Sequence, residues 1–225
     1  MFLIGDSHAL AIKAAALDRG LMLHGGMIDG GRNVNIGFHD RIGDEVRFRK
    51  PEHQALFETY LAAAGVTSLR DFRGPVLCLF GMNIHYLSRA EIWSEFSIAH
   101  GGERHLSQAV TRLATLAMIE GAIQFYKDLI DMGCTVLCPL PPRRSPTADT
   151  NSIPSVFRAL EGVVIDLISA TGARVIDHRH WSLDPEGRLK AEYAFPDPAD
   201  DVHGSLLFGH RLIDQTLAEA STFAA

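Results

Sequence analysis

Ser7 is the residue whose type and position most clearly suggest chemistry. It follows a short apolar segment, Met1 to Ile4, and precedes an alanine-rich segment with helical character. Acyl transfer needs an exposed hydroxyl and donors for the developing oxyanion. A helix N-terminus supplies unpaired N–H groups and the positive end of the helix dipole. Ser7 is therefore a candidate nucleophile, and the alternative is a plain helix cap that follows a turn at Asp6.

Histidines and arginines supply further candidate groups, and the chain has 11 histidines. His24 and His85 follow strand-like segments, so we expect them to line a substrate pocket. Arg143 and its neighbour Arg144 follow two prolines. A planar guanidinium there would bind a carboxylate or phosphate of the substrate. The alternative is that both arginines lie in a solvated loop. The run from Asp177 to His180 admits a metal site, but its spacing is not diagnostic, and we expect neither a metal ion nor a cofactor.

The segments that must position these residues alternate between strands and helices. Apolar runs that end in glycine or proline predict strands, and runs with a period near 3.6 residues predict helices. The 25–50 stretch, rich in Gly, Asn and Asp, is predicted to form a long loop. The 84–100 stretch is predicted as a second loop, which forms a lid over the acyl pocket, packs on the sheet or makes a dimer contact. The 183–193 stretch is predicted to form a hairpin. The predicted strands are 1–4, 21–24, 75–80, 135–139 and 174–176, and the predicted helices are 8–19, 51–64, 103–132, 154–170 and 205–221.

This alternation predicts one domain over residues 1–225, a three-layer α/β/α sandwich around a five-stranded parallel sheet of flavodoxin-like strand order. In such sheets the ligand site lies at the carboxyl ends of the strands. We therefore expect Ser7, His24 to Gly26, Gly81 to His85, Pro139 to Arg144 and Asp177 to His180 to share one edge.

Three short segments, in order along the whole chain, resemble the conserved blocks of the SGNH (GDSL-type) serine hydrolases. Gly5-Asp6-Ser7 is similar to the first block, Gly81-Met82-Asn83 to the Gly-x-Asn of the third, and Asp200-Asp201-Val202-His203 to the Asp-x-x-His of the last. The second block contributes only a glycine after the second strand. Gly25, Gly26, Gly30 and Gly31 compete for that place, and Gly26 is our choice.

The resemblance implies a role for each matched residue. Ser7 attacks an ester carbonyl, His203 acts as general base and then acid, and Asp200 orients His203, with Asp201 as a lesser alternative for that role. The Ser7 N–H, the N–H of Gly26 and the side-chain amide of Asn83 form the oxyanion hole.

Two departures from the family pattern bear on function. The first block continues Ser7-His8-Ala9, which resembles SGNH domains attached to membrane acyltransferases that acylate glycans. Ile84 stands where the third block often has an aspartate, which is not one of the core catalytic groups of the family. The chain also has no Gly-x-Ser-x-Gly segment, the nucleophile motif of α/β-hydrolases.

Composition limits the classes of partner. The 225 residues carry a net charge of −6, with 47% hydrophobic and 21% charged residues, and without a basic patch or an apolar run of membrane-spanning length. We therefore expect no nucleic-acid or membrane partner. The chain reaches Gly5-Asp6-Ser7 directly and shows no signal-peptide pattern, so we expect a cytoplasmic protein, with a homo-oligomer left open.

The predicted function is a carboxylester hydrolase that acts through an acyl-enzyme on short acyl esters, such as small-molecule esters or O-acetylated sugars. The first alternative is an acyltransferase that moves the acyl group to a glycan hydroxyl with the same residues. The second is a non-catalytic or metal-binding α/β module.

Overall fold

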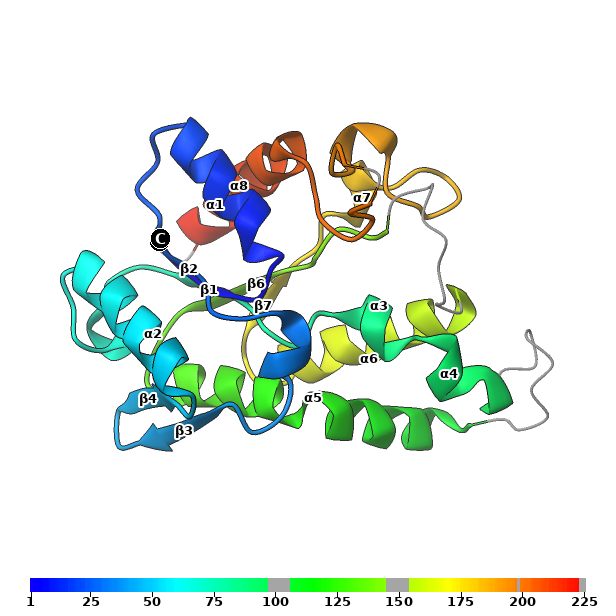
Figure 1. Ribbon diagram of the computed structural model, residues 1–225, viewed down its shortest axis with the longest axis horizontal. Helices are drawn as coiled ribbons and strands as arrows, with labels where there is room; N and C mark the ends of the chain where they lie inside the picture. Colours follow the sequence, from blue (N-terminus) through cyan, green and yellow to red (C-terminus); the bar gives the residue numbers. More distant parts are fainter. Residues whose placement is uncertain (97–105, 145–153, 198, 223–225) are drawn as a thin grey trace.

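The computed structural model describes residues 1–96, 106–144, 154–197 and 199–222. Its centre is a five-stranded parallel sheet in the order β2-β1-β5-β6-β7 (Figure 1). Numbered among the parallel strands alone, this order is 2-1-3-4-5, so the predicted flavodoxin-like sheet is confirmed. The sheet strands are β1 (Phe2–Gly5), β2 (His24–Met27), β5 (Val76–Leu79), β6 (Val136–Pro139) and β7 (Arg174–Ile176).

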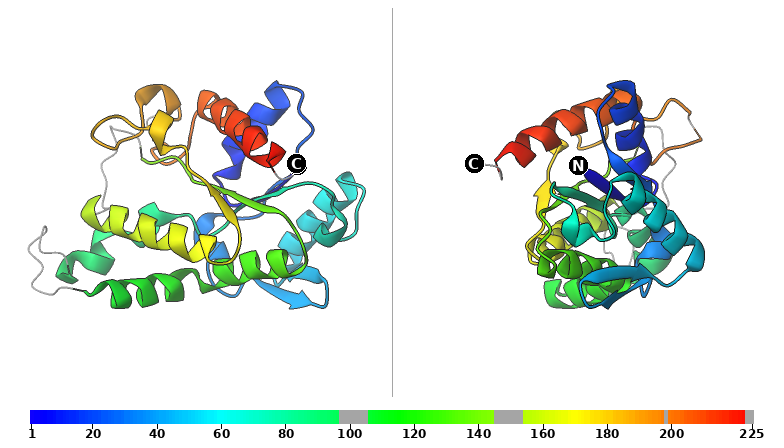
Figure 2. Two further views of the ribbon diagram at one scale, coloured as in Figure 1. Left: turned by 180° about the vertical axis from the view of Figure 1, so that it is seen from behind. Right: turned by 90° about the vertical axis from the view of Figure 1, so that its left-hand side faces the viewer.

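Helices cover both faces of the sheet and complete three layers, as predicted (Figures 1 and 2). One face carries α1 and α8, and the other carries α5 and α6, with α2 beside them. The long helices are α1 (Ala9–Asp18), α2 (Pro51–Ala63), α5 (Gln108–Asp131), α6 (Pro154–Ser169) and α8 (Leu206–Ser221). None of the described helices is both long and apolar enough to cross a bilayer.

The two faces separate because strand side chains alternate. In β1, Phe2 and Ile4 enter the core beneath α5 and α6, whereas Leu3 enters the core beneath α1 and α8. Leu77 and Leu79 of β5 likewise belong to the second core. Every residue of β1, β5 and β6 is buried, as expected for strands covered on both sides.

The second strand lies three residues later than predicted, at His24–Met27 rather than 21–24. Its central glycines suggested a strand end, but they are needed where other groups approach the backbone closely. A Cβ on Gly25 would lie 2.0 Å from the Leu3 carbonyl oxygen, and one on Gly26 would lie 3.2 Å from the Tyr60 hydroxyl. The carboxyl end of this strand is therefore at Met27.

Two predicted loops contain regular structure, and the predicted hairpin is incomplete. The 25–50 stretch holds a 3₁₀ turn, Gly31–Val34, and an antiparallel pair, β3 (His39–Ile42) with β4 (Glu45–Phe48), which α2 follows. The 183–193 segment is not a full hairpin, because only an isolated bridge joins Leu183 to Leu189. The 84–100 stretch forms short helices up to residue 96, and its remainder lies outside the described residues. The other short elements are α3 (Ile84–Leu87), α4 (Ala90–Trp93), α7 (Arg179–Ser182) and the 3₁₀ turns Leu69–Asp71, Ser94–Phe96 and Ala191–Tyr193.

Candidate active site

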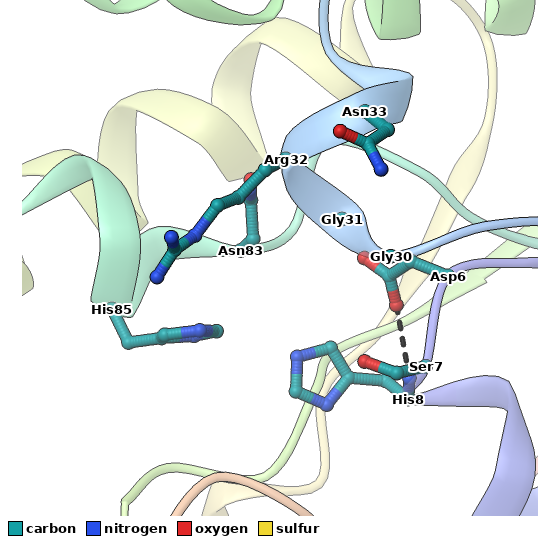
Figure 3. Close-up of a pocket in the computed structure, with 9 residues that line it drawn as sticks. All are labelled: Asp6, Ser7, His8, Gly30, Gly31, Arg32, Asn33, Asn83 and His85. Atoms are coloured by element: carbon teal, nitrogen blue, oxygen red, sulfur yellow. Dashed lines mark hydrogen bonds between the residues drawn. The ribbon is translucent and has the colours of Figure 1, made fainter.

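Ser7 lies in the turn between the carboxyl end of β1 and the start of α1. The Ala9 N–H donates to the Asp6 carbonyl, and the Leu10 N–H donates to the Ser7 carbonyl, so the first helical turn begins at once. The Asp6 carboxylate accepts the His8 N–H at 3.0 Å (Figure 3). This turn leaves Ser7 partly exposed at the helix N-terminus, beside a cavity of about 360 Å³.

The cavity joins three segments that are distant in sequence. Its lining comes from the turn after β1, the 3₁₀ turn after β2 and the turn after β5 (Figure 3). These turns meet because they follow the carboxyl ends of neighbouring parallel strands. The lining residues are Asp6, Ser7, His8, Gly30, Gly31, Arg32, Asn33, Asn83 and His85.

Asn83 is directed to the cavity by a turn in which a glycine has a left-handed backbone conformation. Gly81, directly before Met82, has φ of +77°, and a Cβ there would lie 2.8 Å from the Cβ of Ala122. Only glycine makes this turn without strain. Asn83 is buried, does not cap α3 with its side chain, and neither its Oδ1 nor its Nδ2 has a partner among the described residues.

Gly31 lies against Asn83 and Asp6. A Cβ on Gly31 would lie 2.8 Å from Asp6 Oδ2 and 3.1 Å from Asn83 Cβ, so this position admits only glycine without rearrangement. Gly26, our choice from the sequence, lies inside β2 and does not line the cavity. The displaced strand explains the difference, because the loop that follows Met27 brings Gly30 and Gly31 to the cavity.

Asp29 secures the loop that carries Gly31. Its Oδ1 accepts the Gly30 N–H at 2.7 Å and the Asn33 side-chain amide at 3.1 Å. Its Oδ2 pairs with Lys50 at 3.2 Å and His53 at 3.0 Å. These contacts fix the loop through both oxygens of one carboxylate.

His203 is held by Asp200 in the turn before α8. Its Nδ1 lies 2.8 Å and 2.7 Å from the two carboxylate oxygens, and the same carboxylate accepts the His203 N–H at 3.2 Å. Because a carboxylate only accepts, Nδ1 donates, and a neutral ring then offers its lone pair at Nε2. Asp201, the alternative orienter, instead pairs with Arg144 at 2.8 Å.

His203 lies next to the turn that carries Ser7. Its ring centroid is 5.3 Å from that of His8. The Nε2 atom is buried and has no partner among the described residues, so a hydrogen bond from the Ser7 hydroxyl to His203 is not formed here. Such bonds are often loose in ligand-free sites and tighten when substrate binds.

Buried polar atoms without partners gather around this cavity. Within the described ranges they include Asp6 Oδ2, His8 Nδ1, both side-chain polar atoms of Asn83 and His203 Nε2. An unpaired buried polar group costs about 1–3 kcal/mol, so folds rarely keep several together without a ligand to pair them.

Burial sets the charge of the histidines beside Ser7. It lowers the pKa of His8 well below its usual value, helped by the nearby rings of His85 and His203. Burial, followed by the charges of Arg144, His203 and Arg32, lowers the pKa of His85 to about 4. Both side chains are therefore neutral at pH 7.

Burial also raises the pKa of Asp6 to about 7, against the lowering effect of its hydrogen bond from His8. Between pH 4 and 7 the unfolded chain loses this proton and the folded chain keeps it, so this group stabilises the fold less as the pH rises. Relative to Asp6→Asn, we expect the wild-type free energy of unfolding to fall by as much as about 4 kcal/mol across that window. Chemical denaturation at several pH values measures it.

The exposed carboxylate of Asp166 on α6 provides the control for that experiment. Asp166→Asn is expected to leave the shape of the pH profile unchanged. The Asp6→Asn variant keeps a side-chain oxygen that can accept the His8 N–H, so the comparison isolates the proton. Parallel profiles of Asp6→Asn and the wild type would therefore show that Asp6 is already ionised in the fold.

Two of the expected pocket residues lie elsewhere. His24 begins β2, at the end of the strand opposite to the cavity, and its ring packs on Phe72 at 5.9 Å. Arg143 pairs with Glu161 at 2.6 Å and donates to the Gly187 carbonyl, so it links two elements and does not line the cavity. His85 does line it.

The Asp177 to His180 run is also structural. Asp177 pairs with Arg179 at 2.6 Å, and the buried His178 hydrogen-bonds to Ser182 and to the Pro141 carbonyl. In the part of the chain that the structure describes, no three His, Cys, Asp or Glu side chains are grouped to hold a metal ion.

The sequence reasoning missed Arg32. This residue lines the cavity next to Gly31, and its guanidinium lies 4.6 Å from the centroid of the Tyr86 ring. A basic residue directly after one of the candidate glycines was the available signal, but the second strand was predicted three residues too early, which favoured Gly26 over Gly31.

No family model and no curated protein matches the sequence. Solved structures similar to the chain include a GDSL-like lipase from Bacteroides thetaiotaomicron, at 12% identity over 100% of this chain and 88% of that one, with a TM-score of 0.49. An acetyl xylan esterase has 12% identity over 97% of this chain and 99% of that one, with a TM-score of 0.49. A lipase/acylhydrolase from Enterococcus faecalis has 13% identity over 97% and 93% and a TM-score of 0.47. At these identities and scores, the function is indicated by the residues of the chain itself.

Proposed function

We propose that this protein is a carboxylester hydrolase of the SGNH type, with Ser7 as nucleophile, His203 as base and Asp200 as the residue that orients the base. The observation that carries the proposal is the Asp200–His203 pair: its imidazole lies 5.3 Å from the His8 ring, next to Ser7, and its Nε2 has no partner among the described residues. A carboxylate–imidazole pair next to a hydroxyl at a helix N-terminus is the arrangement that activates a serine.

The reaction proceeds in two steps. Ser7 Oγ forms a bond to the ester carbonyl carbon while His203 Nε2 takes its proton and then gives it to the departing alcohol. Water attacks the acyl-enzyme, passes its proton to the same nitrogen, and releases the acid as Ser7 regains its hydrogen. Asp200 stabilises the imidazolium in both steps.

The oxyanion hole is proposed from the Ser7 N–H, the Gly31 N–H and the Asn83 side-chain amide. Gly31 replaces Gly26 in this role because it lines the cavity against Asn83. The two unpaired polar atoms of Asn83 support the role, since an amide that neither caps a helix nor bonds to a neighbour is available to the oxyanion.

Removing the Asn83 amide is expected to lower kcat on p-nitrophenyl acetate by about 10²–10³-fold in Asn83→Ala, because one oxyanion donor is lost. Asn83→Asp should be slower still, since a carboxylate repels the developing charge. Steady-state kinetics measures both. Asn33→Ala is the comparison, because Asn33 lines the same cavity but its amide is bonded to Asp29, so its smaller loss measures the effect of the Gly31 loop alone. A kcat for Asn83→Ala within about threefold of the wild type would rule out this assignment.

The size and lining of the cavity support a small polar ester as substrate. About 360 Å³ is near the lower end of ligand pockets, and the lining combines two amides, two imidazoles, a hydroxyl, a carboxyl and a guanidinium with two glycines. We therefore propose short-chain acyl esters, of which O-acetylated sugars are one class. Product analysis with sugar acceptors present separates hydrolysis from acyl transfer, because only transfer makes a new ester.

A fluorophosphonate probe tests the proposal as a whole. Ser7 Oγ should displace fluoride and form one phosphonate ester per chain, located by mass spectrometry of the peptide that contains Ser7. The label should be lost in Ser7→Ala and retained when the exposed Ser221 is changed to alanine. Labelling at another serine, or none, together with no ester hydrolysis, would reject a serine hydrolase.

A further inference from the structure

Arg32 projects along one side of the cavity that contains Ser7. It follows Gly31 in the 3₁₀ turn Gly31–Val34, and its side chain reaches across toward His85 (Figure 3). Its guanidinium stacks on the Tyr86 ring at 4.6 Å, which holds the long side chain in one direction. The charge is therefore positioned next to the space that a substrate would occupy.

The neighbouring arginines are already paired with carboxylates, and Arg32 is not. Arg143 pairs with Glu161, Arg144 with Asp201, and Arg89 with Glu91. Within the described ranges of the chain, Arg32 forms no ion pair, and its recorded contact is the ring of Tyr86. Its guanidinium donors are thus available to a ligand.

The rest of the lining leaves this charge uncompensated. His8 and His85 contribute neutral imidazoles, and Asn33 and Asn83 are uncharged. Among the lining residues that the structure describes, the one carboxyl is that of Asp6, which is fully buried and belongs to the opposite side, at the Ser7 turn (Figure 3). The cavity therefore presents a cation without an anion on the side of His85.

We infer that the ester accepted by this cavity carries an anionic group, a carboxylate or a phosphate, which Arg32 binds. The inference rests on the proposed function, since it names the substrate class of the same site. A guanidinium matches either group through two parallel N–H donors, and Arg32 already has its orientation from Tyr86. This assigns the role expected of Arg143 or Arg144 to a residue on a different loop.

Matched substrates isolate the contribution of the charge. The 3- and 4-acetoxybenzoates are compared with their methyl esters, which keep the acetyl group and lose the negative charge. The quantity measured is the ratio of kcat/KM for each acid to kcat/KM for its methyl ester. In Arg32→Gln this ratio is expected to fall about tenfold, because the acid loses a charge-assisted hydrogen bond that its methyl ester does not form.

Arg89 is the matched control. It also lies over the Tyr86 ring, at 5.7 Å, but it pairs with Glu91 and does not line the cavity. Arg89→Gln should leave the ratio unchanged. If Arg32 only supports the loop, Arg32→Gln lowers both esters equally and the unchanged ratio overturns the inference. If Arg32→Gln lowers kcat/KM more for 4-acetoxyphenyl phosphate than for the acetoxybenzoates, phosphate is the group that Arg32 prefers.

A binding measurement separates this inference from the proposed function. Calorimetric titration of the wild-type protein with 4-hydroxybenzoate and with phenyl phosphate needs no turnover. Affinity that falls about tenfold in Arg32→Gln and persists in Arg89→Gln supports an anion site even if Ser7 proves unreactive. No binding of either anion, or equal binding by wild type and Arg32→Gln, overturns the inference even if Ser7 is labelled.

Discussion

Ser7→Ala is expected to lower kcat on p-nitrophenyl acetate by about 10⁴–10⁶-fold, because in the proposed mechanism the Ser7 hydroxyl forms the acyl-enzyme. The hydroxyl is the only group removed, and the backbone bonds of the turn, from Ala9 to Asp6 and from Leu10 to Ser7, do not need it. Melting temperature should therefore stay close to that of the wild type. Stopped-flow and steady-state assays measure the loss.

The control for this change is Ser221→Ala on the last helix, where the hydroxyl donates to the Ala218 carbonyl of its own helix. It should retain full activity. Turnover by Ser7→Ala within about tenfold of the wild type would mean that a different nucleophile acts.

Asp200→Asn is expected to have the next largest effect, a fall in kcat of about 10⁴-fold. The asparagine keeps the size of the side chain but can turn its amide toward His203, which then presents a protonated Nε2 to Ser7 and cannot act as its base. The Asp200 oxygens now lie 2.8 Å and 2.7 Å from Nδ1, so the pair has little freedom to adapt. The loss should appear in kcat rather than in KM.

Asp201→Asn is the adjacent control. Asp201 is partly exposed like Asp200, but its carboxylate faces Arg144 and makes no bond to His203. Its replacement should change kcat on neutral esters by less than about threefold, in line with an exposed ion pair. If the two aspartates show equal losses, Asp200 does not orient the base.

Local sequence patterns were enough to specify the architecture. Short apolar runs such as Val76–Leu79, flanked by glycine and proline, favour central strands, and their alternation with helical segments predicts a parallel sheet covered on both faces. Because parallel strands end at one edge, the residues after β1 and β5 were predicted to meet there, and Ser7 and Asn83 do line one cavity. The pairing of Asp200 with His203 could also be expected from the sequence, since both residues lie in one short turn.

The second strand shows where pattern reasoning is weak. Gly25 and Gly26 resemble a strand end in sequence, yet they occupy the strand interior because Leu3 and Tyr60 approach the backbone there. That three-residue displacement moved His24 away from the site and exchanged Gly26 for Gly31. Close approach between distant segments has no signature in the local sequence.

Which charges remain available to a ligand depends on contacts across the folded chain. The sequence alone does not distinguish Arg143, Arg144 and Arg32, because the role of an arginine depends on whether a carboxylate lies close to its guanidinium. Glu161 and Asp201 pair with the first two, whereas Arg32 lies over the ring of Tyr86 and has no carboxylate partner in the described part of the chain. Residue type and order therefore determine the sheet and the reactive groups along its edge, and pairing between distant segments determines which of those groups can meet a substrate.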